Sequence, residues 1–139
     1  MYNITFMKWI LSILLILMIT GICTAQVPDL VGNWTGSEIA YIAENGTYKL
    51  LEDGSVSLVI SDQKDRLFTG YLTYSLDGKD IVESFAGTIG LDNRMVHIAE
   101  LNDGYDFGTI ISNDEIELIY LADGENGRAA IEKLYRMSA

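Results

Sequence analysis

The chain has 139 residues, of which 20 are Asp or Glu and 9 are Lys or Arg, so its formal net charge at pH 7 is −11. This length leaves room for one domain, and so large an excess of negative charge argues against nucleic-acid backbones and anionic lipid surfaces as partners. One cysteine and one histidine exclude a disulfide framework and a His-rich metal site.

The first 25 residues have the pattern of a targeting segment. The run WILSILLILMI, from Trp9 to Ile19, is apolar except for one serine, as in the central region of a signal peptide. Small residues at Cys23 and Ala25 then suit cleavage directly after Ala25. We therefore expect a secreted or extracytoplasmic surface protein, with residues 1–25 as a signal peptide and residues 26–139 as a single domain.

Two alternatives for this segment stay open. The apolar stretch is just long enough to cross a bilayer, so the segment could instead remain uncleaved as a membrane anchor. In that case the anchor would be the protein's only contact with a membrane. A lipoprotein would need a small residue just before Cys23, where Ile22 stands.

After the only proline, Pro28, apolar residues recur with the period of β-strands, and turn residues separate the runs. No stretch between the runs has the length and period of a helix, except a short one at Tyr48 to Asp53. The linkers are too short for parallel crossovers, so sequential strands should pair as hairpins. The expected strands are Val31–Ala43, Ser55–Asp62, Leu67–Ser75, Ile81–Gly90, Met95–Leu101, Tyr105–Ser112, Glu115–Leu121 and Ala129–Met137.

A sheet of eight sequential antiparallel strands twists enough to close into a barrel, and closure removes its exposed edges. We therefore predict an all-β fold, an eight-stranded antiparallel up-and-down β-barrel. An open meander or a two-sheet sandwich is the alternative.

Asp-Gly pairs precede every second strand, and alternate turns of a meander lie at the same end of the sheet. The pairs are Asp53-Gly54, Asp77-Gly78, Asp103-Gly104 and Asp123-Gly124. Asp-Gly favours the positive φ of tight hairpins, so turn formation is the simplest interpretation, and an acidic rim around an opening is the other. The candidates for a Ca²⁺ site between two rim loops are Asp103, Asp106, Asp123 and Glu125. Neither loop has EF-hand spacing, and we predict no cofactor and no bound metal.

The sequence Phe-x-Gly recurs at Phe68 to Gly70 and at Phe85 to Gly87. Glycine inside a strand indicates bending or close approach, which fits a small barrel. Alternation gives a set of inward-facing candidates for lining a ligand cavity, although a slip of one residue would reverse it. This set is Phe68, Leu72, Tyr74, Phe85, Ile89, Tyr105 and Phe107.

The predicted loop from Glu44 to Gly54 contains the glycosylation sequon at Asn45. Its apolar side chains Tyr48, Leu50 and Leu51 are expected to act as a lid over the opening.

Gly32-Asn33-Trp34, near the start of the first strand, resembles the G-x-W motif of lipocalins and the wider calycin group, which includes avidins and fatty-acid-binding proteins. The resemblance implies a barrel with one closed and one open end, with Trp34 plugging the closed end. A basic residue late in the last strand would pack across the indole, and Arg136 is the first candidate and Lys133 the second.

The chain departs from lipocalins in having no helix before the last strand and no disulfide, and the biotin-contacting residues of avidins do not map onto it. The segments VGNWTG, FTGYL, FAGTIG, YDFGTII and DEIELIY after a leader also resemble short exported proteins of unassigned function in methanogenic archaea.

These features together predict a non-catalytic protein that binds a small, mostly apolar molecule. His97 lacks the partners of a catalytic triad, no serine sits in a nucleophile elbow, and there is no glycine-rich phosphate loop. The alternative is an interaction module for envelope proteins, with a barrel filled by its own side chains.

Overall fold

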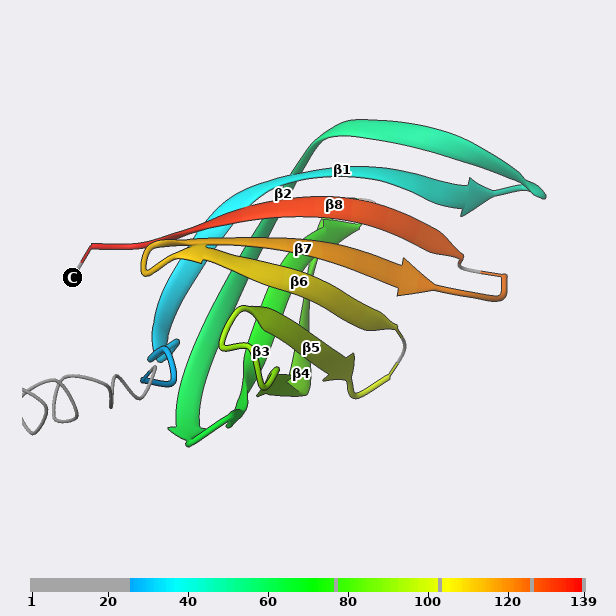
Figure 1. The fold of residues 1–139 in the computed structure, drawn as a ribbon. Helices are drawn as coiled ribbons and strands as arrows, with labels where there is room; N and C mark the ends of the chain where they lie inside the picture. The colour runs from blue at the N-terminus through cyan, green and yellow to red at the C-terminus, as the bar shows by residue number, and fades with distance from the viewer. Residues whose placement is uncertain (1–25, 77, 103, 126, 139) are drawn as a thin grey trace, which may run out of the picture.

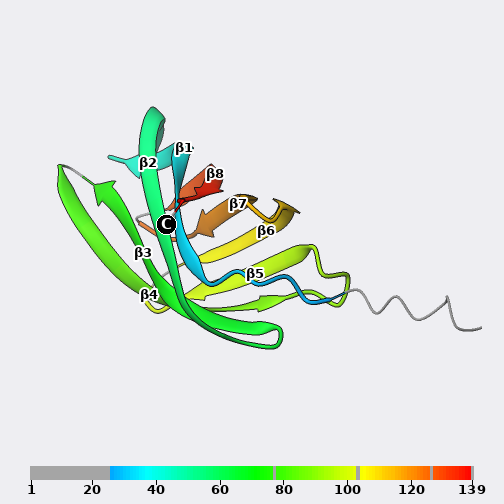
Figure 2. The ribbon, with the colours of Figure 1, turned by 90° about the vertical axis from the view of Figure 1, so that its left-hand side faces the viewer.

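The computed structural model describes residues 26–138 apart from 77, 103 and 126. Each of its strands pairs antiparallel with the next, and the last pairs back with the first to form a closed barrel (Figures 1 and 2). The eight strands are β1 Gly32–Glu44, β2 Thr47–Lys64, β3 Leu67–Leu76, β4 Lys79–Ile89, β5 Met95–Glu100, β6 Tyr105–Ser112, β7 Glu115–Ala122 and β8 Arg128–Arg136. The predicted barrel is confirmed, and the open meander and the sandwich are wrong. The expected leader or anchor at 1–25 lies outside the described residues.

The largest error of the sequence prediction concerns β2. This strand includes most of the segment from Glu44 to Gly54, which was expected to be a loop that acts as a lid and contains a possible short helix. Gly54 pairs with β1 in the ladder, so Asp53-Gly54 is not a turn. The hairpin turns instead at Asn45-Gly46, where φ is 53° and 78°. Asn-Gly is the stronger signal for a tight hairpin, and it places the turn early enough for β1 and β2 to form a long ribbon that reaches past the other strands (Figure 1).

The other predicted Asp-Gly turns have the expected backbone geometry at their glycines. Gly78, Gly104 and Gly124 have φ values of 74°, 99° and 82°. They lie at the same end of the barrel as the β1–β2 turn, because consecutive hairpins alternate between the two ends. This end is the open one. Asp77 and Asp103 themselves lie outside the described residues.

The half of the barrel away from these turns is filled by apolar side chains. Phe68 pairs with Gly87 and Phe85 with Gly70 across β3 and β4. A Cβ atom at Gly87 would overlap the Phe68 ring, and the two phenylalanine rings meet edge to face with centroids 6.1 Å apart. The repeated Phe-x-Gly is therefore a packing device. The buried core consists of Leu30, Trp34, Val56, Leu58, Ile60, Phe68, Leu72, Phe85, Ile89, Val96, Ile98, Ile110, Ile116, Leu118 and Leu134.

Trp34 closes the end of this core. Its side chain is 1% exposed, and its indole Nε1 donates a hydrogen bond to the Leu30 carbonyl at 3.0 Å. The Arg136 guanidinium lies over the indole with its Cζ 4.2 Å from the ring centroid. Lys133, the second candidate for this contact, is exposed.

Arg136 also binds the chain segment that crosses the closed end. Its three side-chain nitrogens donate to the carbonyls of Asn113, Val31 and Asp29 at 2.9, 2.7 and 2.8 Å. Gly32 has a φ of 146°, and a Cβ there would lie 3.0 Å from the Arg136 Nη1. Glycine at this position therefore allows both the backbone conformation and the approach of the guanidinium.

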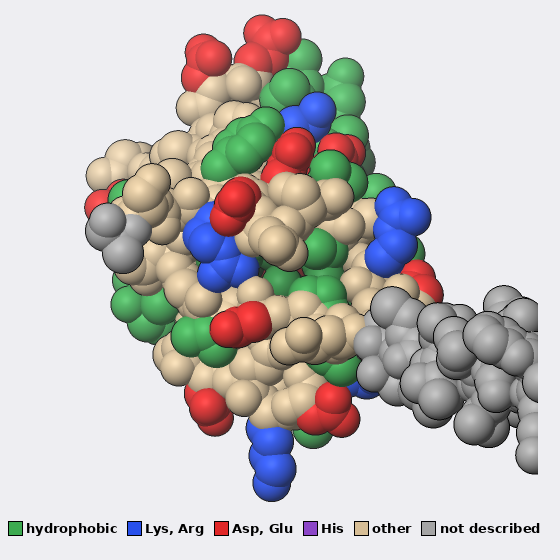
Figure 3. All heavy atoms as spheres, turned by 60° about the vertical axis from the view of Figure 1, so that its left-hand side comes forward, with side chains coloured by type: hydrophobic (Ala, Val, Ile, Leu, Met, Phe, Trp, Pro, Cys, Tyr) green, Lys and Arg blue, Asp and Glu red, His purple; other side chains and the backbone are tan. Residues whose placement is uncertain are grey.

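Charged side chains of both signs are spread over the surface. On the face seen in Figure 3, the Asp and Glu side chains occur as separate spots, interspersed with isolated Lys and Arg side chains. This face therefore carries no continuous basic patch.

Replacing the plug tests this account of the closed end. We expect Trp34→Ala to lower the free energy of unfolding by about 3–5 kcal/mol, because it removes a buried aromatic side chain and the surface beneath Arg136. Urea denaturation followed by circular dichroism measures this change. Tyr135→Ala, on the half-exposed outer face of β8, is the control and should cost less than about 1 kcal/mol. Equal losses in the two variants would contradict the plug.

Candidate functional site

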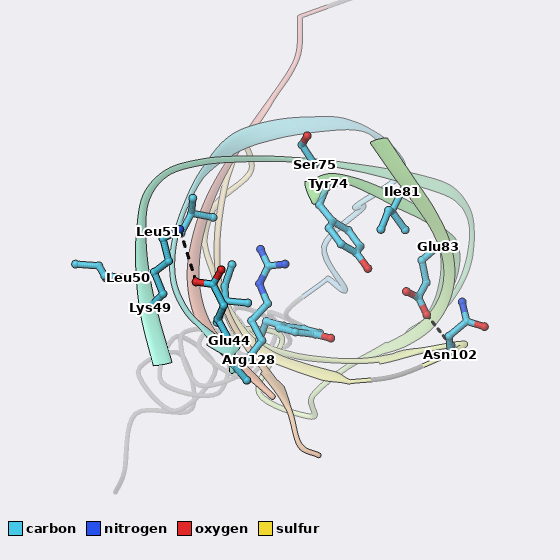
Figure 4. Close-up of a pocket in the computed structure, with 13 residues that line it drawn as sticks. Glu44, Lys49, Leu50, Leu51, Tyr74, Ser75, Ile81, Glu83, Asn102 and Arg128 are labelled. Atoms are coloured by element: carbon cyan, nitrogen blue, oxygen red, sulfur yellow. Dashed lines mark hydrogen bonds and ion pairs between the residues drawn. The ribbon is translucent and has the colours of Figure 1, made fainter. Parts of the chain in front are cut away.

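The open end of the barrel contains a cavity of about 560 Å³. Figure 4 shows Tyr74, Glu83 and Arg128 pointing inward within the ring of strands. The wall combines apolar side chains with charged and hydroxyl groups. The lining residues are Ile42, Ala43, Glu44, Lys49, Leu50, Leu51, Tyr74, Ser75, Ile81, Glu83, Asn102, Tyr120 and Arg128.

Between this cavity and the apolar core lies a layer of inward-facing carboxyl groups from different strands. Glu38, Glu83, Asp106 and Glu132 are 2%, 5%, 3% and 9% exposed. Glu100, on β5, is partly buried beside them. Acidic side chains are almost never fully buried unless they have partners, so this layer is the least expected part of the barrel.

Arg128 is the one basic side chain that pairs with this layer among the residues that the structure describes. It forms an ion pair with Glu38, its side chain is 10% exposed, and its Cζ lies 5.4 Å from the centroid of the Tyr74 ring. Glu38 also lies directly opposite Glu132 across the β1–β8 ladder. Two carboxyl groups placed directly across neighbouring strands repel each other when both are charged, so this pair is a source of repulsion inside the barrel.

The other carboxyl groups have polar contacts of their own. Glu83 accepts a hydrogen bond from the backbone N–H of Asn102 at 2.6 Å. Glu100 and Asp106 share a side-chain hydrogen bond, which requires one of them to carry a proton. In contrast, Glu132 makes no hydrogen bond and no ion pair with any residue in the described part of the chain.

Burial raises the pKa values of three carboxyl groups in this layer, those of Glu100, Asp106 and Glu132. Desolvation is the main cause for Glu132, whose pKa rises to about 8 with added repulsion from Asp106 and Glu38. Desolvation likewise raises the pKa of Asp106 to about 7, although its hydrogen bond with Glu100 opposes the shift. The pKa of Glu100 rises to about 9 through desolvation and the neighbouring carboxylates. At neutral pH much of this layer is therefore protonated.

A second, deeper pocket of about 20 Å³ lies within the acidic layer. Tyr74, Tyr120 and Arg128 line both this pocket and the larger cavity, so they stand between the two. The deep pocket has room for a single group the size of a water molecule. Its lining residues are Glu38, Val56, Leu72, Tyr74, Glu100, Tyr120, Arg128 and Glu132.

The sequence-predicted lining residues are divided among three places. Phe68, Leu72, Phe85 and Ile89 are buried in the core, with Leu72 at the floor of the deep pocket, and Tyr74 lines both cavities.

Tyr105 and Phe107 are a correction, because their side chains are 61% and 42% exposed and lie on the outer face. Asp106, between them, points inward instead. The expected alternation therefore had the wrong phase in β6, which is the one-residue slip that reverses such a set.

Sequence reasoning missed the acidic layer, although alternation contained the signal. Glu83 has the same parity as Phe85, which the sequence places inside, and Glu38 has the same parity as Trp34. Alternation thus predicts an inward position for these carboxyl groups. Charged side chains usually face solvent, so this prediction was not made.

The candidate metal ligands are not brought together. Asp106 is inside the barrel, Asp123 and Glu125 are exposed at the rim, and Asp103 lies outside the described residues. No group of three or more His, Cys, Asp and Glu side chains in the described ranges is arranged to hold a metal ion. Asn45 is exposed in the β1–β2 turn, where a glycan would have room.

The outer wall carries a band of exposed apolar side chains. Ile39, Ile131, Ile119 and Phe107 are successive cross-strand partners on β1, β8, β7 and β6. Each is between 42% and 54% exposed. Figure 1 shows these four strands side by side on one face of the barrel.

No protein-family model matches the chain, and no curated protein has a matching sequence. Within the described residues, no helix is long and apolar enough to cross a membrane.

The acidic layer predicts an unusual pH dependence of stability. The pKa values of Glu132, Asp106 and Glu100 are higher in the folded state than their ordinary values of 4.5, 3.8 and 4.5, so the folded protein binds more protons than the unfolded chain. Their contribution to stability is complete below the ordinary values and is lost as the pH rises through about 9. We therefore expect the free energy of unfolding, from urea titrations, to fall steadily between pH 5 and pH 9.

Glu132→Gln should make this decline shallower and should be more stable than the wild type at the alkaline end. Glu52→Gln, at an exposed position on β2, is the matched control and should keep the wild-type slope. A stability that is constant or rises over this range would contradict the raised pKa values.

Proposed function

We propose that this protein is a secreted or surface-tethered, non-catalytic binding protein that takes a small organic molecule into its open end. The observation that carries the proposal is the cavity of about 560 Å³, a volume in the range of small-molecule sites. Ile42, Leu51 and Ile81 supply an apolar wall for the body of such a molecule. The calycin-like architecture and the leader pattern of residues 1–25 support the same proposal.

The closed end favours a single route of entry. Trp34 and Arg136 block the far end, and the apolar core fills the space above them. A ligand therefore enters past the Lys49–Glu44 ion pair, whose atoms are 3.7 Å apart at the exposed rim. Surface ion pairs of this kind are weak, so this one is a small barrier to entry.

Blocking the cavity tests the proposal. We expect a neutral solvatochromic dye such as Nile red to gain fluorescence on binding the wild type. Ile81→Trp, which fills the cavity wall, should weaken dye binding at least about tenfold, which corresponds to about 1.4 kcal/mol. Val82→Trp, at the neighbouring position that is 65% exposed, is the control and should bind the dye as the wild type does. Native mass spectrometry of protein purified from cells should also show a retained ligand.

The proposal fails if the wild type takes up no dye and repeatedly carries no ligand. It also fails if Ile81→Trp and Val82→Trp bind the dye equally well, because the dye would then lie outside the cavity.

A protein-interaction module is the second candidate function, and the apolar band on the outer wall favours it. Contiguous exposed apolar residues on a soluble protein mark contact sites for other macromolecules. The net charge of −11 disfavours an anionic lipid surface in that role, so a protein partner of the envelope is the occupant we consider.

Charge placed in the band tests this second function. We expect Ile131→Lys to abolish photocrosslinks formed in intact cells by a photoreactive amino acid at the position of Ile119, its cross-strand neighbour. Val82→Lys, on the opposite part of the wall, should leave them unchanged. An absence of crosslinks from the wild-type band would exclude the second function.

A further inference from the structure

The deep pocket identifies the chemical class of ligand, and this step rests on the function proposed above. Glu38, Glu100 and Glu132 line a space of about 20 Å³ that shares Tyr74, Tyr120 and Arg128 with the wall of the larger cavity. Glu132 is 9% exposed and has no hydrogen-bond or ion-pair partner within the described residues. A buried carboxyl group without a partner is costly, so a partner supplied by the ligand would relieve that cost.

The size of the pocket limits what that partner can be. A volume of about 20 Å³ accepts a group the size of one water molecule, which a primary ammonium matches and a quaternary ammonium exceeds. A metal ion is disfavoured because the carboxyl groups do not converge: no set of three ligating side chains forms among the described residues. An ammonium group needs only separate acceptors around it, since each of its three N–H bonds points in a different direction.

The charge balance of the layer also favours a cation. Among the described residues, five carboxyl groups of this layer accompany one guanidinium, and that guanidinium, of Arg128, is already paired with Glu38. The raised pKa values of Glu100, Asp106 and Glu132 mean that these groups bind protons near neutral pH, and a cationic ligand would replace such a proton. The titratable and charged groups that face Glu132 from the surrounding strands are Glu38, Tyr74, Glu83, Glu100, Asp106, Tyr120 and Arg128.

We propose that the barrel binds primary amines, with the ammonium group in the deep pocket against Glu132 and Glu100 and the organic body in the larger cavity. Binding would release a proton from the acidic layer, because a carboxyl group that is protonated in the free protein becomes the partner of a cation. The affinity for an amine should therefore increase as the pH rises from 6 to 9, a range in which a primary amine stays charged and these carboxyl groups ionise.

Three probes of equal chain length test this proposal: octylamine, octanol and octanoate, each displacing Nile red from the wild-type protein. We expect octylamine to bind at least about tenfold more tightly than octanol at pH 8, because a hydrogen bond between an ammonium and a carboxylate is stronger than one between neutral groups. Calorimetry in buffers of different ionisation enthalpy should show proton release with octylamine and none with octanol.

Glu132→Gln should remove most of the preference for octylamine while leaving octanol binding unchanged, which separates a loss of recognition from a loss of folding. Glu52→Gln is the control and should keep the preference. If octylamine and octanol bind equally, or if Glu132→Gln keeps the full preference, the amine inference is overturned and the binding function stands.

Tighter binding of octanoate would also overturn the inference. It would mean that an anion reaches Arg128, whose buried Nε has no partner in the part of the chain that the structure describes. Displacement by none of the three probes, together with a failure of dye uptake, would overturn the proposed function itself.

Discussion

Closure of the barrel between β1 and β8 is the constraint on which the rest of the structure depends. It is secured at one end by Trp34 and Arg136, because the guanidinium covers the indole and binds two backbone carbonyls of the crossing segment and one of the β6–β7 turn. Closure gives every strand two partners and leaves no edge in the sheet. It also aligns Glu38 with Glu132, so the contact that seals the barrel is part of the same ladder that creates the acidic layer.

The barrel interior therefore has two layers with opposite energetic roles. The apolar layer around Phe68 and Phe85 stabilises the fold by burial and close packing. The acidic layer above it reduces stability as the pH rises, because burial disfavours the charged forms of Glu100, Asp106 and Glu132. Natural proteins depart from the requirements of stable folding mainly where function requires it. Here the departure is a set of buried carboxyl groups, and they lie between the core and an open cavity. This placement makes the acidic layer the best candidate for recognition.

Much of the fold follows from local sequence. The number of strands, their antiparallel order and the turns at Gly78, Gly104 and Gly124 follow from period-two alternation and from residues that tolerate positive φ. The candidate site was far less predictable. Tyr105 and Phe107 were assigned to the interior, and Asp106 was only a candidate for a rim Ca²⁺ site, because alternation gives two faces without saying which one is buried.

The sequence by itself determined the strand period and the turn positions other than that of β2, since each depends on conformations local to the chain. The contact between Trp34 and Arg136 joins the first strand to the last, so local sequence alone did not determine it. Only the tertiary structure decided that Glu38, Glu83, Glu100, Asp106 and Glu132 gather around one arginine. These residues lie on five different strands, and barrel closure with its particular register brings them together. The raised pKa values of Glu100, Asp106 and Glu132 then arise from burial in the assembled interior.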